Sequence, residues 1–213
     1  MANPTIKELN DASRFLPIAE LDHPGIKTFV LDQLSKGGRL VTAFMLYQLL
    51  MLLLGIGTLT RALFLAFSGN SFPLLIIAGA LVFSFSLLII IHELLHGLAL
   101  KLTGAQHVHY GGYFRRFIFY AEADRHVLNK KQFAFVALTP LVAVQLLTLL
   151  GVVVFWLSPA VYFMLIVMAT HSFFCAGDIG LLTVFFRHKK VYTFDVADAK
   201  KSYYFREIDD ALV

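Results

Sequence analysis

The amino-acid sequence predicts an all-α integral membrane protein with four transmembrane helices. The 213-residue chain is 58% hydrophobic and only 15% charged, whereas a soluble domain carries roughly 25% charged residues. Its apolar residues lie in long blocks, and about 20 apolar residues are enough for a helix to cross a bilayer. Its basic residues gather in polar segments that would share one side of such a bundle. These observations indicate a helical membrane domain between two polar ends.

The four apolar blocks divide the chain into three regions. We predict transmembrane helices at about 40–60, 73–100, 132–157 and 160–186. They lie between a cytoplasmic N-terminal segment, 1–39, and a cytoplasmic tail, 187–213. The N-terminal segment lacks the apolar core of a signal peptide, so we expect no cleaved leader. Within it, residues 26–34 have an amphipathic pattern typical of a helix on a membrane surface.

Charge predicts the orientation of the four helices. Basic residues near helix ends favour the cytoplasmic side, and three basic clusters fall on one side of a four-span bundle. Their members are Lys36, Arg39, Arg115, Arg116, Arg125, Lys130, Lys131, Arg187, Lys189 and Lys190. We therefore expect both termini in the cytoplasm. The net charge of +4 fits this topology and contact with anionic lipids of the bilayer, and we find no motif for nucleic acid.

Ionisable side chains are confined to the second and fourth predicted helices. The acidic ones are Glu93 and Asp178, and the histidines are His92, His96 and His171. A charged group at membrane depth costs about 2.5–3.5 kcal/mol on insertion scales and is a candidate for function by default. These five residues are therefore the candidate site.

The second helix carries the motif H-E-x-x-H, formed by His92, Glu93 and His96. Residues four apart share one face of a helix, so both imidazoles can bind one metal ion. The glutamate lies beside that face and can reach a metal-bound water, whose pKa zinc lowers to about 7. The alternative is structural: two histidines at a helix end reach the membrane interface beside a glutamate.

A catalytic zinc site needs a third protein ligand, and the fourth helix offers Asp178 and His171. From the outer helix ends, His92 lies ~28 Å deep and Asp178 ~27 Å deep, if both helices are straight with the usual rise per residue. His171 lies only ~16 Å along its helix by the same rise. Depth therefore favours Asp178 as the ligand. For His171 we leave open a supporting role behind the metal, a substrate contact, or a plain interhelical hydrogen bond.

The sequence resembles a family of small bacterial membrane proteins, the putative zincin peptidases. The residues that carry the resemblance are HELLHGLALKLTGA at 92–105, ALTPL at 137–141 and CAGDIG at 175–180. More broadly, the chain resembles the site-2 protease group of intramembrane zinc metalloproteases. The resemblance implies one Zn2+ ion held by His92, His96 and Asp178, with Glu93 as general base and access from the cytoplasmic side. It departs from the site-2 pattern Leu-Asp-Gly, because Asp178 lies in Gly-Asp-Ile.

Two further sequence features lie near the H-E-x-x-H motif. Pro140 lies inside the third predicted helix, where it removes one backbone hydrogen bond and frees the carbonyl of Val136. We expect either a kink that opens space beside the metal or an ordinary tolerated proline. Residues 107–121 surround Gly111-Gly112, which favours a small β-hairpin at the cytoplasmic interface. The alternative is an interfacial loop rich in aromatic residues and arginine.

These observations predict a membrane-embedded zinc metalloprotease that hydrolyses peptide bonds of membrane-associated substrates by attack of a metal-bound water. The alternative is a non-enzymatic metal-binding membrane protein, such as a transporter subunit or an inactive peptidase-like assembly partner. Glu93 favours the enzyme, since a metal carrier needs no base beside its ligands. The substrate and the oligomeric state do not follow from the sequence.

Overall fold

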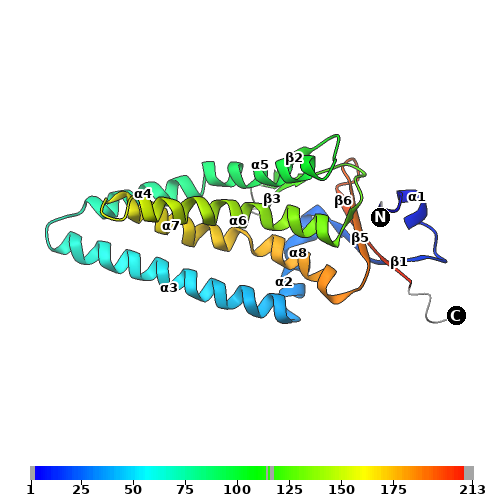
Figure 1. Ribbon diagram of the computed structural model, residues 1–213, viewed down its shortest axis with the longest axis horizontal. Helices are drawn as coiled ribbons and strands as arrows, with labels where there is room; N and C mark the ends of the chain where they lie inside the picture. Colours follow the sequence, from blue (N-terminus) through cyan, green and yellow to red (C-terminus); the bar gives the residue numbers. More distant parts are fainter. Residues whose placement is uncertain (1–2, 114, 116–117, 209–213) are drawn as a thin grey trace.

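The computed structural model describes residues 3–113, 115 and 118–208. It is an elongated bundle of helices with a β-sheet across one end (Figure 1). The helices of the bundle are α3 (Arg39–Phe67), α4 (Phe72–Ser84), α5 (Leu87–Leu102), α6 (Lys130–Val154), α7 (Ala160–Phe174) and α8 (Ala176–Arg187). Two short helices, α1 (Ile6–Leu9) and α2 (Ile26–Ser35), precede the bundle, with a 3-10 turn at His23–Gly25 before α2.

The prediction of an all-α fold is wrong, because the chain also forms two antiparallel sheets. The larger sheet has the order β1-β6-β5-β4, from strands Phe15–Asp22, Lys201–Glu207, Val191–Val196 and Leu128–Asn129. It joins the two polar ends of the chain, since Phe15 pairs with Glu207. Strands β5 and β6 are neighbours in the chain, but β1 and β4 pair with them across long separations, which leave no signal in a local sequence window.

The second sheet is a strand pair, β2 (His109–Tyr113) with β3 (Ile118–Glu122). Of the two alternatives for residues 107–121, the described residues therefore form the hairpin; Phe114, Arg116 and Phe117 lie outside the description. Gly111 and Gly112 lie within β2 and not at its turn, opposite Tyr120 and Phe119. A Cβ at Gly111 would lie 2.4 Å from the Tyr120 hydroxyl, so this glycine makes room for the ring.

Two helices, α3 and α6, are each long and apolar enough to cross a membrane. The helices expected at 73–100 and 160–186 are both broken: α4 and α5 meet at 44°, and α7 and α8 at 45°. The number of candidate spans among the described residues is therefore two, or up to four if each bent pair counts as one. This length and apolarity are consistent with a protein that associates with a membrane.

The two breaks lie side by side in the bundle. Ser84, at the end of α4, hydrogen-bonds Thr170 of α7 through their hydroxyl oxygens at 2.8 Å. Ser86 donates from its hydroxyl to the carbonyl of Val82 one turn back at 2.5 Å, an arrangement that bends helices. Cys175 separates α7 from α8. The second break places Asp178 in the first turn of α8, where the helix dipole favours a carboxylate.

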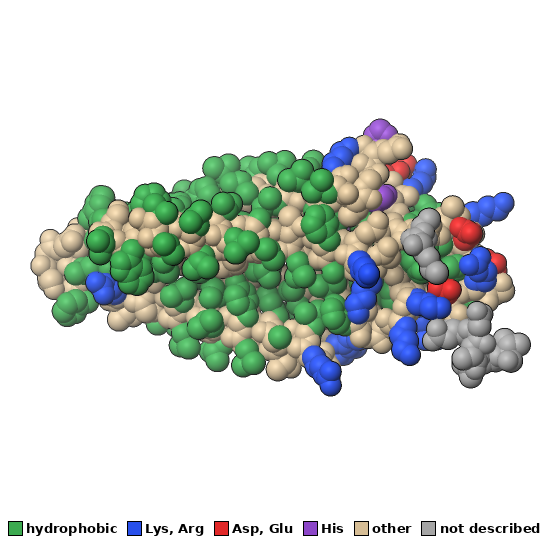
Figure 2. All heavy atoms as spheres, viewed as in Figure 1, with side chains coloured by type: hydrophobic (Ala, Val, Ile, Leu, Met, Phe, Trp, Pro, Cys, Tyr) green, Lys and Arg blue, Asp and Glu red, His purple; other side chains and the backbone are tan. Residues whose placement is uncertain are grey.

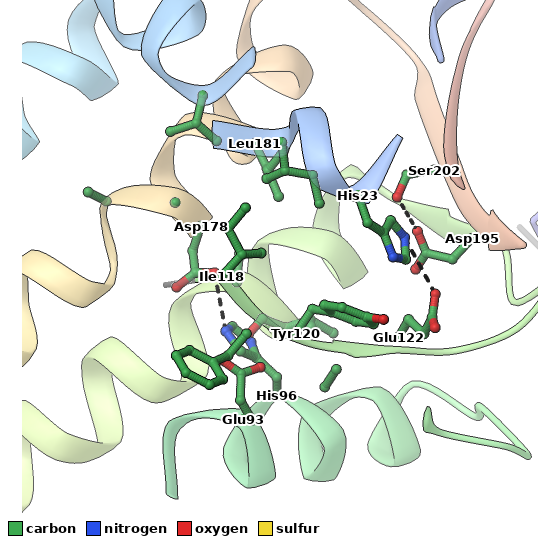
Figure 3. Close-up of a pocket in the computed structure, with 18 of the residues that line it drawn as sticks. His23, Glu93, His96, Ile118, Tyr120, Glu122, Asp178, Leu181, Asp195 and Ser202 are labelled. Atoms are coloured by element: carbon green, nitrogen blue, oxygen red, sulfur yellow. Dashed lines mark hydrogen bonds and ion pairs between the residues drawn. The ribbon is translucent and has the colours of Figure 1, made fainter. Parts of the chain in front are cut away.

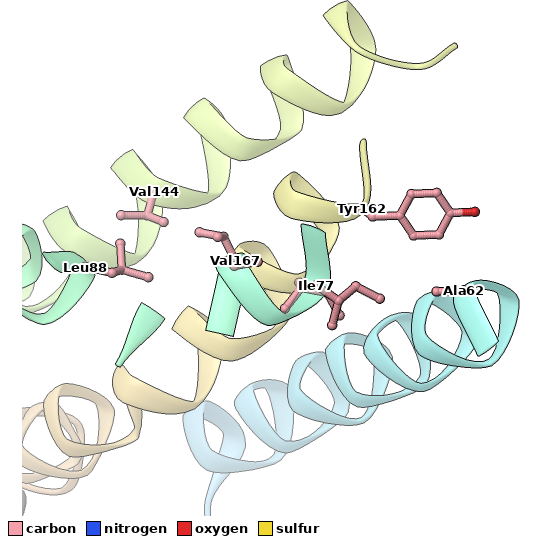
Figure 4. Close-up of a cluster of buried hydrophobic side chains, with 8 residues drawn as sticks. Ala62, Ile77, Leu88, Val144, Tyr162 and Val167 are labelled. Atoms are coloured by element: carbon pink, nitrogen blue, oxygen red, sulfur yellow. The ribbon is translucent and has the colours of Figure 1, made fainter. Parts of the chain in front are cut away.

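An apolar cluster holds the helices together at the end away from the sheet. It is formed by Ala62, Ile77, Ala80, Leu88, Val144, Tyr162, Ile166 and Val167, contributed by five helices (Figure 4). Arg61 donates from Nε to the Tyr162 hydroxyl at 3.0 Å beside it. The side chains of Gln48 and Gln145 donate to backbone carbonyls of α7, so the few polar groups of α3 and α6 tie the bundle to α7.

The face of the bundle seen in Figure 2 is apolar along its length, and Lys and Arg side chains gather at the sheet end. Exposed leucines of α3 and α6 include Leu46, Leu49, Leu53, Leu146, Leu147 and Leu150. Arg61 lies at the opposite end of the bundle. The surface thus has an apolar belt with basic residues concentrated at one end.

Helix α2 lies against α8, a contact that the expectation of a surface helix at 26–34 did not include. A Cβ at Gly180 of α8 would lie 2.6 Å from Cγ1 of Val30 and 3.2 Å from its Cβ. Glycine at 180 therefore permits the close approach of the two helices. The contact closes one side of the space between Asp178 and the hairpin.

Candidate metal centre

Three side chains from two helices converge at the sheet end of the bundle. His92 and His96 lie one turn apart on α5, with their Nε2 atoms 3.1 Å apart. Asp178 of α8 places Oδ2 3.4 Å from Nε2 of His92 and Oδ1 3.2 Å from Nε2 of His96. One ligand atom from each of the three residues lies within 4.8 Å of the others. Helices α5 and α8 thus bring together the three residues named as metal ligands from the sequence.

The second ring nitrogen, Nδ1, of His92 and of His96 also has a hydrogen-bond partner. Nδ1 of His92 lies 3.1 Å from Nε2 of His171, and Nδ1 of His96 lies 3.0 Å from the carbonyl oxygen of Val136. A carbonyl only accepts, so Nδ1 of His96 carries a proton, and in the neutral ring Nε2 is then the nitrogen with the lone pair. Metal-binding histidines in proteins are oriented by this kind of bond at their second nitrogen.

Pro140 explains why the Val136 carbonyl is available. In a regular helix this oxygen would accept from the backbone N–H four residues later, and proline has none. The sequence predicted the freed carbonyl but not its partner. The structure pairs it with His96 of α5, so the proline of α6 orients a residue of the site.

His171 lies on the far side of His92 from Asp178, and it is fully buried. Straight-helix depth placed it two turns away from the motif, but the bend between α7 and α8 brings its ring against His92. It is not among the described residues that line the cavity, so a substrate contact is not supported. His92, His171 and Cys175 form a second group within 4.8 Å, and this group shares His92 with the first.

Glu93 lies beside the three convergent side chains and is not one of them. Its Oε2 is buried and makes no hydrogen bond to the described residues. Asp178 Oδ2 is likewise buried without a hydrogen bond there, although it lies near His92. A buried carboxylate oxygen without a donor is costly unless a ligand satisfies it.

Whether the site suits zinc depends on these unbonded oxygens of Glu93 and Asp178 and on the Nε2 atoms of His92 and His96. Two imidazole nitrogens and one carboxylate are a three-ligand set that catalytic zinc sites use, and such sites leave one position open. The free oxygen of Glu93 belongs to a side chain that lies beside these donors (Figure 3). The residues present therefore fit one zinc ion.

A cavity of about 490 Å³ opens beside this group. Its walls come from α2, α5, β3, α6, α8 and the larger sheet. Glu93, His96 and Asp178 lie at one end, and His23, Glu122, Asp195 and Ser202 lie at the other, with Tyr120 between them (Figure 3). The sequence did not point to this second end, because its members come from three distant segments and form no motif.

Burial shifts the acid groups at that second end, which lies outside the candidate spans. Burial, and then the nearby carboxylates of Asp195 and Asp124, raises the pKa of Glu122 to about 7. Burial raises the pKa of Asp195 to about 6, against the opposing hydrogen bond from Ser202. Burial, and then the charge of Lys200, lowers the pKa of His23.

Two histidines one helical turn apart, a glutamate between them and a carboxylate from a second helix form the donor set of the zinc metallopeptidase class. A family model described as Putative zincin peptidase matches residues 85–192, and the chain belongs to this family. The match begins just before α5 and ends in β5, so it includes both helices that carry the convergent residues. Neither the curated proteins nor the solved structures include a match to the chain.

Proposed function

We propose that the protein is a membrane-embedded zinc endopeptidase that cleaves membrane-associated peptide substrates, as the site-2 protease group does. His92, His96 and Asp178 would hold the ion, and Glu93 would act as the general base. The observation that carries the proposal is the free Oε2 of Glu93, buried beside three convergent donors at the end of a cavity.

The ion would supply Lewis acidity, which polarises the peptide carbonyl and lowers the pKa of a water. Glu93 accepts the proton of the attacking water and then delivers it to the departing amine. His171 and the Val136 carbonyl keep the two imidazoles in the orientation that exposes Nε2. The apolar walls from α2 and α6 exclude bulk water, which strengthens each of these electrostatic interactions.

Strand β3 suits the binding of an extended substrate. It is an edge strand of a two-stranded sheet, and all five of its residues, 118–122, line the cavity. Side chains alternate between the two faces of a strand, so all of them line one cavity only when the edge of the strand faces that cavity. A peptide added along this edge would present its backbone, rather than a helical turn, to Glu93.

The distribution of charge supports the proposed orientation in the membrane. Lys and Arg side chains gather at the sheet end (Figure 2). Arg61 lies at the other end of the bundle, beside Tyr162. By the positive-inside rule the sheet, both termini and the site would face the cytoplasm.

The test compares wild type with Glu93→Gln for zinc content of purified protein and for membrane-protein fragments in cells. Glutamine keeps the shape of the side chain but cannot accept a proton, so loss of rate of ~10²–10⁴-fold is expected. The variant should keep its zinc while a substrate accumulates uncut. Glu20→Gln, on the exposed strand β1, is the matched control and should cleave normally.

Equal fragments from wild type and Glu93→Gln would rule out hydrolysis and leave a metal-binding membrane protein without enzymatic activity. If neither wild type nor the variants contain zinc, the metal centre itself is ruled out.

A further inference from the structure

The end of the cavity opposite the proposed metal site is a buried acidic pocket. Glu122 of β3 and His23 of the turn before α2 are 6% and 2% exposed, so both are more than nine-tenths buried. Asp195 of β5 lies with them and accepts a hydrogen bond from the Ser202 hydroxyl at 2.6 Å. All four side chains line the cavity (Figure 3).

Two atoms in this pocket have no hydrogen bond to the described residues. They are Oε2 of Glu122 and Nδ1 of His23. His23 Nε2 lies 3.5 Å from Glu122 Oε2, which is longer than a normal hydrogen bond. A neutral His23 that turns its N–H toward Glu122 leaves a lone pair on Nδ1. Among the described residues, the pocket therefore leaves two acceptor atoms without a donor.

The charges around the pocket are also unbalanced. Among the described residues that line the cavity, Lys27 is the single Lys or Arg, and its side chain is exposed. Lys200 is near enough to affect Glu122 and is also exposed. Asp124 adds a third carboxylate near Glu122 and Asp195. Buried carboxylates without a buried cation are costly, and a cationic ligand relieves that cost.

We propose that Glu122, Asp195 and His23 form a subsite that binds a positively charged group of the peptide substrate. The group would be an ammonium, from a lysine side chain or from a free amino terminus. Its N–H donors match the acceptor atoms that the pocket leaves open. This inference rests on the proposed function, because it takes the occupant of the cavity to be a peptide.

The strand geometry sets the distance of this charge from the reacting bond. Strand β3 runs between the two ends of the cavity, and its full span from Ile118 to Glu122 is about 13 Å at the usual rise of a strand. A peptide extended along β3 would therefore place its cationic group within about four residues of the bond that is cut. The distance from the pocket to the reacting bond would then determine where the peptide is cleaved.

The pKa values of Glu122 and Asp195 support a cationic occupant. Both are raised, to about 7 and about 6, first of all by burial. A bound ammonium would lower the pKa of each carboxyl and hold both ionised. The pocket therefore gains its full charge when the ligand arrives.

The test measures peptide binding, so it does not depend on cleavage. The protein is the full chain in detergent with Glu93→Gln, and the probes are fluorescent ten-residue peptides. One series moves a single lysine through the peptide, and a second series has neutral norleucine at the same positions. We expect the lysine peptide to bind at least ~10-fold more tightly at one position, as expected for a charged hydrogen bond in a desolvated site.

Adding Glu122→Gln or Asp195→Asn should abolish that difference, while the control Glu207→Gln, at the end of β6, should keep it. Free and acetylated amino termini separate the two sources of the ammonium. Equal binding of lysine and norleucine peptides at every position, or no binding of either, would overturn the inference. Two zinc ions per chain that fall to one in Glu122→Gln would also overturn it and make the pocket a second metal site. A failure of hydrolysis is seen separately, in the fragment comparison of wild type with Glu93→Gln.

Discussion

At the scale of single residues, the two histidines of the motif differ in the group that hydrogen-bonds their Nδ1 atom. His96 is oriented by a backbone carbonyl of α6, and His92 by the side chain of His171. Only the second contact can be removed by a single side-chain substitution. A substitution at His171 therefore changes the orientation of His92, a proposed metal ligand, without removing a proposed ligand.

Asp178→Ala should lose zinc, because it removes one of three proposed ligands. His171→Ala should weaken zinc binding by about 10–100-fold, the usual effect of losing a group that orients a metal-binding histidine. Titration against a chelator measures both. Cys175→Ser should leave zinc affinity unchanged. Loss of zinc in Cys175→Ser that matches Asp178→Ala would instead place the ion among His92, His171 and Cys175.

The raised pKa of Glu122 predicts how stability depends on pH. Its folded-state pKa of about 7 exceeds the ordinary value of 4.5, so the folded protein binds more protons between these values. Stability should therefore fall as pH rises through this window. Without a ligand, Glu122→Gln should melt at a higher temperature than wild type at pH 8 and at the same temperature at pH 5. A gain in melting temperature that is largest at pH 5 would contradict this assignment.

At the scale of elements, Pro140 supports the site through a carbonyl of its own helix, α6, which continues past the proline. Pro140→Ala restores a backbone N–H that competes with His96 for the Val136 carbonyl. Zinc affinity should fall by about 10-fold, while the melting temperature should not fall. The control Pro73→Ala, in the first turn of α4, should change neither zinc affinity nor melting temperature. Unchanged zinc affinity in Pro140→Ala would mean that His96 needs no bond from α6.

The packing of helix α2 against α8 depends on Gly180. Gly180→Ala would place a Cβ 2.6 Å from Val30, which is buried and cannot turn away freely. Forcing the two helices apart should cost about 1–3 kcal/mol of unfolding free energy. Gly177→Ala, on the same helix, meets no atom within 4 Å and should gain stability of up to ~1 kcal/mol. Thermal unfolding compares the two, and equal effects would show that α2 does not press on α8.

At the scale of the whole molecule, the apolar belt and the basic sheet end predict one orientation in the membrane. Single cysteines in a Cys175→Ala background, at Ser68 and at Asp198, lie exposed at opposite ends of the bundle. An impermeant thiol reagent should label the first from outside the cell and the second only after the membrane is opened. Reporters fused after Lys36 and after Val213 should read cytoplasmic; an external reading at either end would overturn the orientation.

The sequence by itself determined the features that depend on local spacing. The period of the helix places His92 and His96 on one face, and the length of apolar runs predicts α3 and α6, because both follow from neighbouring residues. Loss of a backbone N–H at Pro140 is equally local, so the free Val136 carbonyl was predictable. What the sequence added beyond this was the choice of Asp178 over His171, which rested on straight helices.

Only the tertiary structure decided how these features meet. It revealed the breaks after Ser84 and at Cys175, the sheet between the two chain ends, and the pairing of Val136 with His96. It also assembled the acidic pocket of His23, Glu122 and Asp195 from segments that share no motif. The physical reason is common to all of them. Each depends on contacts between residues distant in the chain, where burial and packing, rather than the local pattern, fix the partner.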